Sequence, residues 1–303
     1  MAGGPHLPDD RFADLGGPVH YVEWDGPPDR TFVLLHGLGG SYLQWLLAGP
    51  ELARLGRVFA IDLAGFGKTP RDGRSSKLTA NRALLSHFIE EVAGGGPVIL
   101  GGNSMGGGIA IMQAAVEPAT VDGLILTSSI YPWAKGARPS PVVMGGFALY
   151  RVPRVGEWVL RQRQGRLSAE RVVRLGFRVT MVDPSAVPEW LVREHVDMLV
   201  ERAADPDAGP AFLEAARSLL RLGENVERGR ALLDDVKCPV VVIHGRQDRF
   251  VPAAFAWAAT ETHPDWLIRV LPGVGHVPQL EAPERWMKAV EDWLATLGGS
   301  APG

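Results

Sequence analysis

The chain has 303 residues, 46% of them hydrophobic and 21% charged, with a formal net charge of −3 and a pI near 6.3. This composition is typical of a globular protein that is long enough for one large core, or for a core and a smaller unit. The net negative charge argues against a protein that binds nucleic acid. The single cysteine, Cys238, excludes a disulfide within the chain, so no oxidising compartment is required.

The amino terminus and the apolar runs predict where the protein resides. Residues 1–6 have neither the basic segment nor the apolar segment of a secretory signal. No uninterrupted apolar stretch approaches the roughly 20 residues of a membrane span. We therefore expect a cytoplasmic protein without stable membrane insertion. The chain also has no H-E-x-x-H motif and no cluster of Cys and His, so we expect no metal and no cofactor.

Four segments near the amino terminus predict strands. Residues 11–15 and 19–24 predict a hairpin that turns through Gly-Gly-Pro. Residues 31–35 predict an apolar strand that ends at a His-Gly pair, and residues 57–61 predict another that ends at an aspartate.

Two helices are expected among these strands and after them. Ser41 can N-cap a helix to about Leu55. The apolar face of that helix would hold Leu43, Leu46, Leu47 and Leu52. A second helix is expected to start at Thr79 and to end before the three glycines at 94–96.

The most informative segment is residues 102–106, which read Gly-Asn-Ser-Met-Gly. The apolar residues 97–100 before it predict a buried strand, and residues 109–115 after it predict a buried helix. A G-x-S-x-G pentapeptide between a strand and a helix is typical of a nucleophile elbow, in which Ser104 takes a strained backbone conformation. Because the chain holds 37 glycines, the pentapeptide needs support from other residues.

Two loops downstream of Ser104 supply a carboxylate and a histidine. The strand predicted at 240–243 leads into a loop with Asp248, and the strand predicted at 266–271 leads into a loop with His276. Open α/β sheets place their sites at the carboxyl ends of their strands. A serine nucleophile needs a histidine base, and a carboxylate must orient that base. His244, at the end of the first of these strands, is interpreted as structural.

Together these motifs resemble an α/β-hydrolase of the lidded esterase/lipase kind. The resemblance is carried by His36-Gly37, Asp62-x-x-Gly65-x-Gly67, Gly102-x-Ser104-x-Gly106, the Asp248 loop and the Gly275-His276 loop. It implies an α/β fold with a mostly parallel eight-stranded sheet flanked by helices. Residues 1–130 and 236–303 would form the core domain, and residues 131–235 would form an inserted helical cap, or lid.

The resemblance also implies the roles of particular residues. Ser104 would be the nucleophile, His276 the general base and Asp248 the acid, in the chain order Ser, Asp, His that this fold uses. The oxyanion hole would consist of the backbone N–H groups of Leu38 and Met105, because backbone amides need no particular side chain.

Other polar residues near these motifs have structural interpretations. Some relatives carry their acid just past the strand expected at 123–127, where this chain has Ser128 and Ser129. Asp62 precedes Ser104 and so breaks the chain order; we interpret it as a residue that holds its own loop together. His36 is interpreted as a brace for the loop that follows it.

Strand–helix alternation stops between residues 131 and 235. Helical patterns cover 168–182, 188–203 and 210–222. Residues 135–178 hold ten Lys/Arg and two Asp/Glu, a net +8, which leaves −11 for the rest of the chain. This stretch could steer anionic substrates or anionic surfaces to the site, or it could be a solvated helical face. After residue 235 the core resumes, and Pro283 begins a last helix with an inner stripe of Trp286, Val290, Trp293 and Leu294.

The sequence favours a serine hydrolase of carboxylic esters with short to medium acyl chains. Its partner would be a small-molecule ester, with Trp133, Val251 and Val277 in the substrate pocket, and we expect a monomer or a homodimer. One alternative is a carbon–carbon bond hydrolase of ring-fission products, which shares the Gly-Asn-Ser-Met-Gly-Gly wording, although the residue after His276 is Val277 where those enzymes have Trp. Another is a ligand-binding receptor with very slow turnover. Epoxide- and halide-processing relatives carry Asp at the elbow, so Ser104 excludes them.

Overall fold

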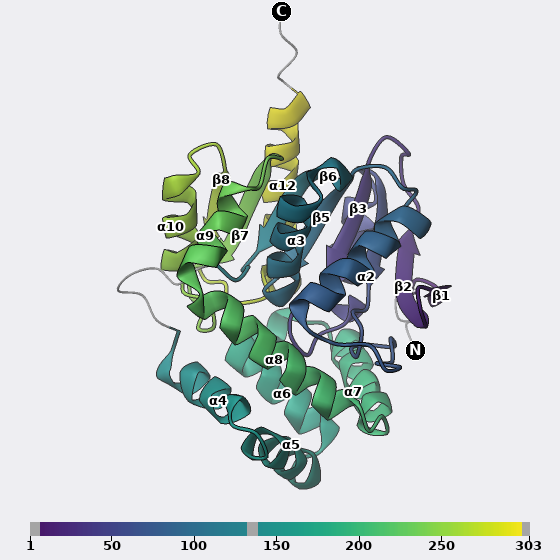
Figure 1. Ribbon diagram of the computed structural model, residues 1–303, viewed down its shortest axis with the longest axis vertical. Helices are drawn as coiled ribbons and strands as arrows, with labels where there is room; N and C mark the ends of the chain where they lie inside the picture. The colour runs from purple at the N-terminus through teal and green to yellow at the C-terminus, as the bar shows by residue number, and fades with distance from the viewer. Residues whose placement is uncertain (1–6, 132–138, 299–303) are drawn as a thin grey trace, which may run out of the picture.

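The computed structural model describes residues 7–131 and 139–298. Figure 1 shows a sheet with helices on both faces and a group of helices at one end of it. Among the described residues, no helix combines the length and the apolar character that crossing a membrane requires.

Eight strands form a single sheet in the order β1-β2-β4-β3-β5-β6-β7-β8. The strands are β1 (Arg11–Asp14), β2 (Pro18–Trp24), β3 (Thr31–Leu35), β4 (Arg57–Ile61), β5 (Val98–Asn103), β6 (Val121–Thr127), β7 (Val240–Gly245) and β8 (Leu267–Leu271). β2 pairs antiparallel with β1 and β4, and every other pair is parallel. This confirms the prediction of a mostly parallel eight-stranded sheet.

The central strands are apolar throughout because helices cover both faces of the sheet. In β3, Val33 and Leu35 pack on one face while Phe32 and Leu34 pack on the other, as the period of two along a strand requires. The first face is covered by α2 (Leu78–Glu91), α3 (Met105–Val116) and α10 (Ala253–Thr262), which Figure 1 shows in front of the sheet.

The second face is covered by residues 42–53 and by α12 (Pro283–Gly298), which lies behind the sheet in Figure 1. The four residues of its predicted inner stripe are buried. The indole of Trp286 donates a hydrogen bond of 2.8 Å to Thr127 Oγ1 at the end of β6. This bond satisfies the one polar atom of a large side chain in the core, and it fixes α12 against the edge of the sheet where the candidate site lies.

The prediction of one helix from Ser41 to Leu55 is wrong. The segment contains a 3₁₀ turn, η1 (Tyr42–Trp45), and a separate short helix, α1 (Gly49–Leu52). Ser41 does cap the first turn, where its side chain accepts the N–H of Leu43. A continuous helix fails at Gly49-Pro50 because proline in a helix interior removes a hydrogen bond and clashes with the preceding turn, whereas it is tolerated in the first turn.

Six α-helices lie between β6 and β7 in the described part of the chain. They are α4 (Pro141–Arg151), α5 (Val155–Arg166), α6 (Ala169–Thr180), α7 (Glu189–Ala203), α8 (Ala208–Glu224) and α9 (Val226–Asp234), with a 3₁₀ turn η3 (Pro184–Ala186) before α7. Three of them match the predicted helical patterns to within two residues. Figure 1 shows α4 to α8 gathered at one end of the sheet. We call residues 131–235 the cap; that they form a separate domain stays a prediction.

Candidate active site

Ser104 joins β5 to α3 in a sharp turn. Its backbone angles are φ 52° and ψ −111°, and it is one of four non-glycine residues with positive φ in the described part of the chain. Such conformations cost of order 1–3 kcal/mol for a residue with a Cβ, and they persist where the surrounding structure imposes them. The strained serine predicted from the pentapeptide is therefore present.

The glycines on either side allow this turn because there is no space for a side chain. A Cβ on Gly102 would lie 2.5 Å from Gly107 N, and a Cβ on Gly106 would lie 2.3 Å from Leu35 O. Both contacts are with backbone atoms, which cannot move away without shifting the sheet. The close approach of Gly106 to the end of β3 also brings the segment that begins at His36 next to the elbow.

Asp248 and His276 come together although 28 residues separate them. Asp248 Oδ2 lies 2.7 Å from His276 Nδ1, and both side chains are buried. Asp248 Oδ1 accepts the backbone N–H groups of Phe250 at 2.8 Å and Val251 at 2.9 Å. Burial raises the pKa of Asp248, but the charge of His276 and the hydrogen bonds of His276 and His244 outweigh it and hold the pKa well below its usual range. Asp248 is therefore an ionised acceptor that fixes the proton of His276 on Nδ1.

The loop that carries His276 is tied to the elbow. The side-chain amide of Asn103, the residue before Ser104, donates to His276 O and to Thr127 O, each at 3.1 Å. Phe250 stacks on the imidazole, with ring centroids 5.0 Å apart and an angle of 24° between the planes. No hydrogen bond joins Ser104 Oγ to His276 within residues 7–131 and 139–298. Serine–histidine contacts are often looser without substrate.

Two backbone N–H groups next to Ser104 have no hydrogen-bond acceptor among the described residues. Gly37 lies against the elbow, since a Cβ on it would be 3.4 Å from Ser104 Cβ. The N–H groups of Leu38 and Met105 donate to none of the residues that the structure describes, whereas Gly37 N donates to Gln44 Oε1 and Gly40 N to Gly37 O. Met105 is the first residue of α3, so its N–H has no partner within the helix and points out of the positive end of the helix dipole.

Asp62 holds its loop together, as its position before Ser104 predicts. It accepts the backbone N–H groups of Tyr42 at 2.7 Å and Lys68 at 2.8 Å, and its Oδ2 lies 2.7 Å from His20 Nδ1. His36 braces two loops: its Nδ1 donates to Gly37 O at 2.8 Å, and its Nε2 accepts the N–H of Leu63 at 3.1 Å. Burial lowers the pKa of His36, which keeps the ring neutral, as this pair of contacts requires.

The three residues predicted for the substrate pocket have different outcomes. Trp133 lies outside the described residues. Val251 packs in the core on the α3 side of the sheet, and Val277 packs in the core on the α12 side. Both side chains are buried, and their contact with a substrate stays a prediction.

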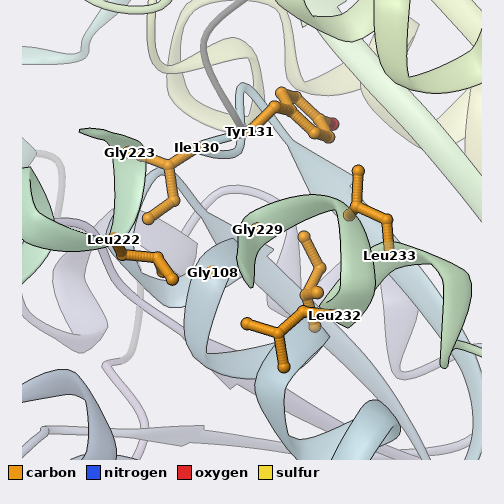
Figure 2. A pocket seen from close by; sticks show the side chains of 9 residues that line it. Gly108, Ile130, Tyr131, Leu222, Gly223, Gly229, Leu232 and Leu233 are labelled. Carbon is orange, nitrogen blue, oxygen red and sulfur yellow. The ribbon is translucent and has the colours of Figure 1, made fainter. Parts of the chain in front are cut away.

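A small apolar hollow lies between α3, α8 and α9 (Figure 2), and Ser104, Asp248 and His276 do not line it. It is lined by Gly108, Ile111, Ile130, Tyr131, Leu222, Gly223, Gly229, Leu232 and Leu233. Ser104 O accepts the N–H groups of Gly108 at 3.2 Å and Ile130 at 3.3 Å. The hollow therefore begins one helical turn from the nucleophile and is closed by α8 and α9 of the cap. Sequence reasoning did not predict it, because these helices lie more than a hundred residues along the chain from Ser104.

His244, interpreted from the sequence as structural, contacts the loop that carries Asp248. Its Nε2 lies 2.8 Å from Val251 O, to which it donates, and 3.3 Å from Asp248 Oδ2. Both contacts hold the loop that carries the carboxylate. A histidine at the end of a strand gives no signal for this in the sequence, because the loop folds back onto it. Among the described residues, no group of three or more His, Cys, Asp or Glu could hold a metal ion.

Comparison with known proteins gives one family. The model of the alpha/beta hydrolase family matches residues 32–289. The chain is 29% identical over 282 residues to the dihydrolipoyllysine-residue acetyltransferase component of the acetoin cleaving system of Pseudomonas putida, an alignment of 90% of this chain and 66% of that protein. The chain thus spans slightly less than two thirds of the length of that relative.

A second relative and a solved structure are covered almost completely. The chain is 26% identical over 292 residues to the 2-hydroxy-6-oxo-6-(2'-aminophenyl)hexa-2,4-dienoic acid hydrolase of Metapseudomonas resinovorans, with 94% of this chain and 91% of that protein aligned. The structure of a thermophilic esterase from Thermogutta terrifontis superimposes with a TM-score of 0.67 at 23% identity, covering 95% of this chain and 98% of that one.

Proposed function

Because the chain belongs to the alpha/beta hydrolase family, we propose that it is a serine hydrolase that cleaves carboxylic esters through an acyl-enzyme intermediate. The observation that carries the proposal is the strained Ser104 beside two unpaired backbone amides, with the Asp248–His276 pair fixed on the next loops. These groups are sufficient for acyl transfer to water, and no other reagent is needed.

The proposed reaction has two halves. Ser104 Oγ attacks the ester carbonyl while His276 Nε2 takes the hydroxyl proton, and Asp248 stabilises the resulting imidazolium through Nδ1–H. The N–H groups of Leu38 and Met105 bind the oxyanion of the tetrahedral intermediate. The intermediate collapses, the carbon–oxygen bond to the alcohol breaks, and the imidazolium protonates the leaving alkoxide. Water then attacks the acyl-enzyme by the same steps, releases the acid and restores Ser104.

Cleavage of a carbon–carbon bond in a ring-fission dienoate is the second candidate. It is supported by the relative from Metapseudomonas resinovorans, whose name describes such a hydrolase, and by the Gly-Asn-Ser-Met-Gly-Gly wording of the elbow. Against it, the residue after His276 is Val277, where those enzymes have Trp. We expect an uncharged acyl chain of short to medium length because the helices of the cap limit the depth of the site.

The test compares kcat/KM for p-nitrophenyl butyrate with kcat/KM for a 2-hydroxy-6-oxo-dienoate. We expect the ester to be the better substrate, and we expect phenylmethylsulfonyl fluoride to inactivate the protein by modifying Ser104. Faster cleavage of the dienoate would replace the ester proposal with the carbon–carbon hydrolase. A burst of one equivalent of nitrophenol followed by negligible turnover would instead indicate a ligand-binding receptor.

A further inference from the structure

A buried carboxylate joins the cap to the loop that carries His276. Glu281 is the last residue of the short helix α11 (Pro278–Glu281), and its side chain is buried. Its Oε1 accepts the backbone N–H groups of Val182 and Asp183, each at 2.7 Å, and its Oε2 accepts the N–H of Gly275 at 2.6 Å. Val182 and Asp183 follow α6 in the cap, and Gly275 precedes His276. One side chain therefore bonds two segments that lie about ninety residues apart.

The same two segments are also in direct contact through their backbones. His276 N donates to Thr180 O, at the end of α6, over 2.6 Å. The approach requires a glycine before His276, since a Cβ on Gly275 would lie 2.3 Å from Thr180 O and 2.9 Å from Met181 Cα. Because His276 O is held by Asn103 on the elbow, the backbone of His276 is bound by the cap on one side and by the elbow on the other.

The chemistry of the three partners specifies a carboxylate at position 281. All three are N–H donors, so the side chain must accept on both oxygens and donate on neither. An amide of the same shape could still accept from the two cap N–H groups, but it would turn its NH₂ group toward the N–H of Gly275. The link to the His276 loop would then become a contact between two donors, while the link to the cap would survive.

We propose that Glu281 is a positioning residue that couples the end of α6 to the His276 loop, so that the imidazole keeps the geometry for proton transfer only while this part of the cap is docked. The proposal rests on the proposed serine-hydrolase function. It goes beyond that function, since it makes α6 of the cap part of the machinery that positions the general base.

Loss of this positioning has a signature that simple destabilisation lacks. An alkoxide leaving group needs a proton from the imidazolium, whereas p-nitrophenolate leaves without one. A displaced His276 therefore slows hydrolysis of ethyl butyrate more than hydrolysis of p-nitrophenyl butyrate. A lower fraction of folded protein slows both esters by the same factor.

Glu281→Gln provides the test and Glu214→Gln provides the matched control. Glu214 in α8 also links cap to core with three hydrogen bonds, from Arg71 Nη2, Ser75 Oγ and Ser76 N, but its partners carry no part of the triad. Rates are divided by the concentration of Ser104 that a fluorophosphonate titrates. We expect Glu281→Gln to lower kcat/KM for ethyl butyrate about tenfold more than for p-nitrophenyl butyrate, within the range that small misplacements cost. Glu214→Gln should leave the ratio of the two rates unchanged.

An equal effect of Glu281→Gln on both esters would overturn the proposal. If the wild type hydrolysed neither ester while Ser104 still reacted with the fluorophosphonate, the proposed ester function would fail, and this coupling would be tested by hydrogen exchange alone. That measurement uses the unmodified protein, so it also applies if Glu281→Gln does not fold. We expect the amides of Val182, Asp183, Gly275 and His276 to exchange as one cooperative unit. Rapid exchange of the last two beside protected cap amides would contradict the coupling.

Discussion

Ser104 has a backbone conformation that few residues with a side chain adopt, and the sheet, α3 and the adjacent glycines impose it. A plain turn would carry glycine here without strain. A strained serine at this position therefore supports its proposed role as the nucleophile. For single residues, we therefore predict the effect of replacing the proposed nucleophile, base and acid.

Replacement of the proposed nucleophile or the proposed base should remove nearly all turnover. We expect Ser104→Ala and His276→Ala each to lower kcat on the order of 10⁶-fold, with little further loss in the double variant, because members of a triad act as one unit. Steady-state assays with p-nitrophenyl butyrate measure this, and thermal unfolding confirms that the variants fold. A Ser104→Ala protein that retains a tenth of the activity would exclude Ser104 as the nucleophile.

The two buried aspartates beside histidines should respond differently to the same change. Asp248→Asn removes the acceptor for His276 Nδ1–H and should lower kcat on the order of 10⁴-fold. Asp62→Asn weakens contacts with two backbone N–H groups and His20, so it should lower Tm and leave kcat per folded molecule nearly unchanged. The comparison needs kcat normalised to titrated Ser104. A larger catalytic loss in Asp62→Asn would mean that Asp62 is the acid.

At the scale of elements, α6 and α7 of the cap pack through a histidine. The Nδ1 of His195 donates to Leu191 O at 2.8 Å, and its ring meets the ring of Phe177 at 5.1 Å between centroids. Burial lowers the pKa of His195 to about 4. The unfolded chain therefore binds a proton below about pH 6.5 that the folded protein excludes, so acid destabilises this part of the cap.

This linkage predicts how stability changes with pH. The free energy of unfolding should fall as the pH drops from 6.5 toward 4, and His195 should contribute at most about 2 kcal/mol of this loss at pH 5. His195→Gln should reduce the loss by that amount in urea unfolding at pH 7 and pH 5. His87→Gln, on an exposed position of α2, is the control and should change nothing. Identical pH dependence in wild type and His195→Gln would show that the fold does not keep this half-buried histidine neutral.

At the scale of the whole molecule, the basic stretch of residues 135–178 stands against an acidic remainder. Two of its ten cations are paired in the described residues: Arg151 bonds Glu224, and Arg174 bonds both Glu170 and Glu189. Local pairing reduces the field that reaches the site, and salt screens what remains beyond about 10 Å at 0.1 M.

We therefore expect the basic stretch to act as a solvated surface and not as a guide for substrates. Added salt should change kcat/KM for an anionic ester and for a neutral ester of the same acyl chain by the same factor. The measurement is kcat/KM for both esters from about 10 mM to 500 mM salt. A fall for the anionic ester alone would show electrostatic steering toward the cap.

Local sequence patterns are enough to predict which elements form and where the candidate site lies. Apolar runs, glycines and prolines act over a few residues, so the eight strands, the elbow at Ser104 and the loops of Asp248 and His276 could be predicted from local pattern. The break at Gly49-Pro50 was within reach of the same reasoning, because the signal is the proline itself. The family resemblance added the chain order of the triad, which spacing alone does not give.

Which distant groups meet around these residues depends on how the elements pack in the folded chain. Glu281 accepts backbone N–H groups from the cap, and His244 bonds a backbone carbonyl of the Asp248 loop. Every residue carries a backbone carbonyl and every residue except proline carries an N–H, so neither partner leaves a mark in the sequence. The hollow between α3, α8 and α9 likewise exists only because the two cap helices fold back over α3. The identity of a polar side chain is local information, whereas the partner that satisfies it is fixed by the packing of elements far apart in the chain.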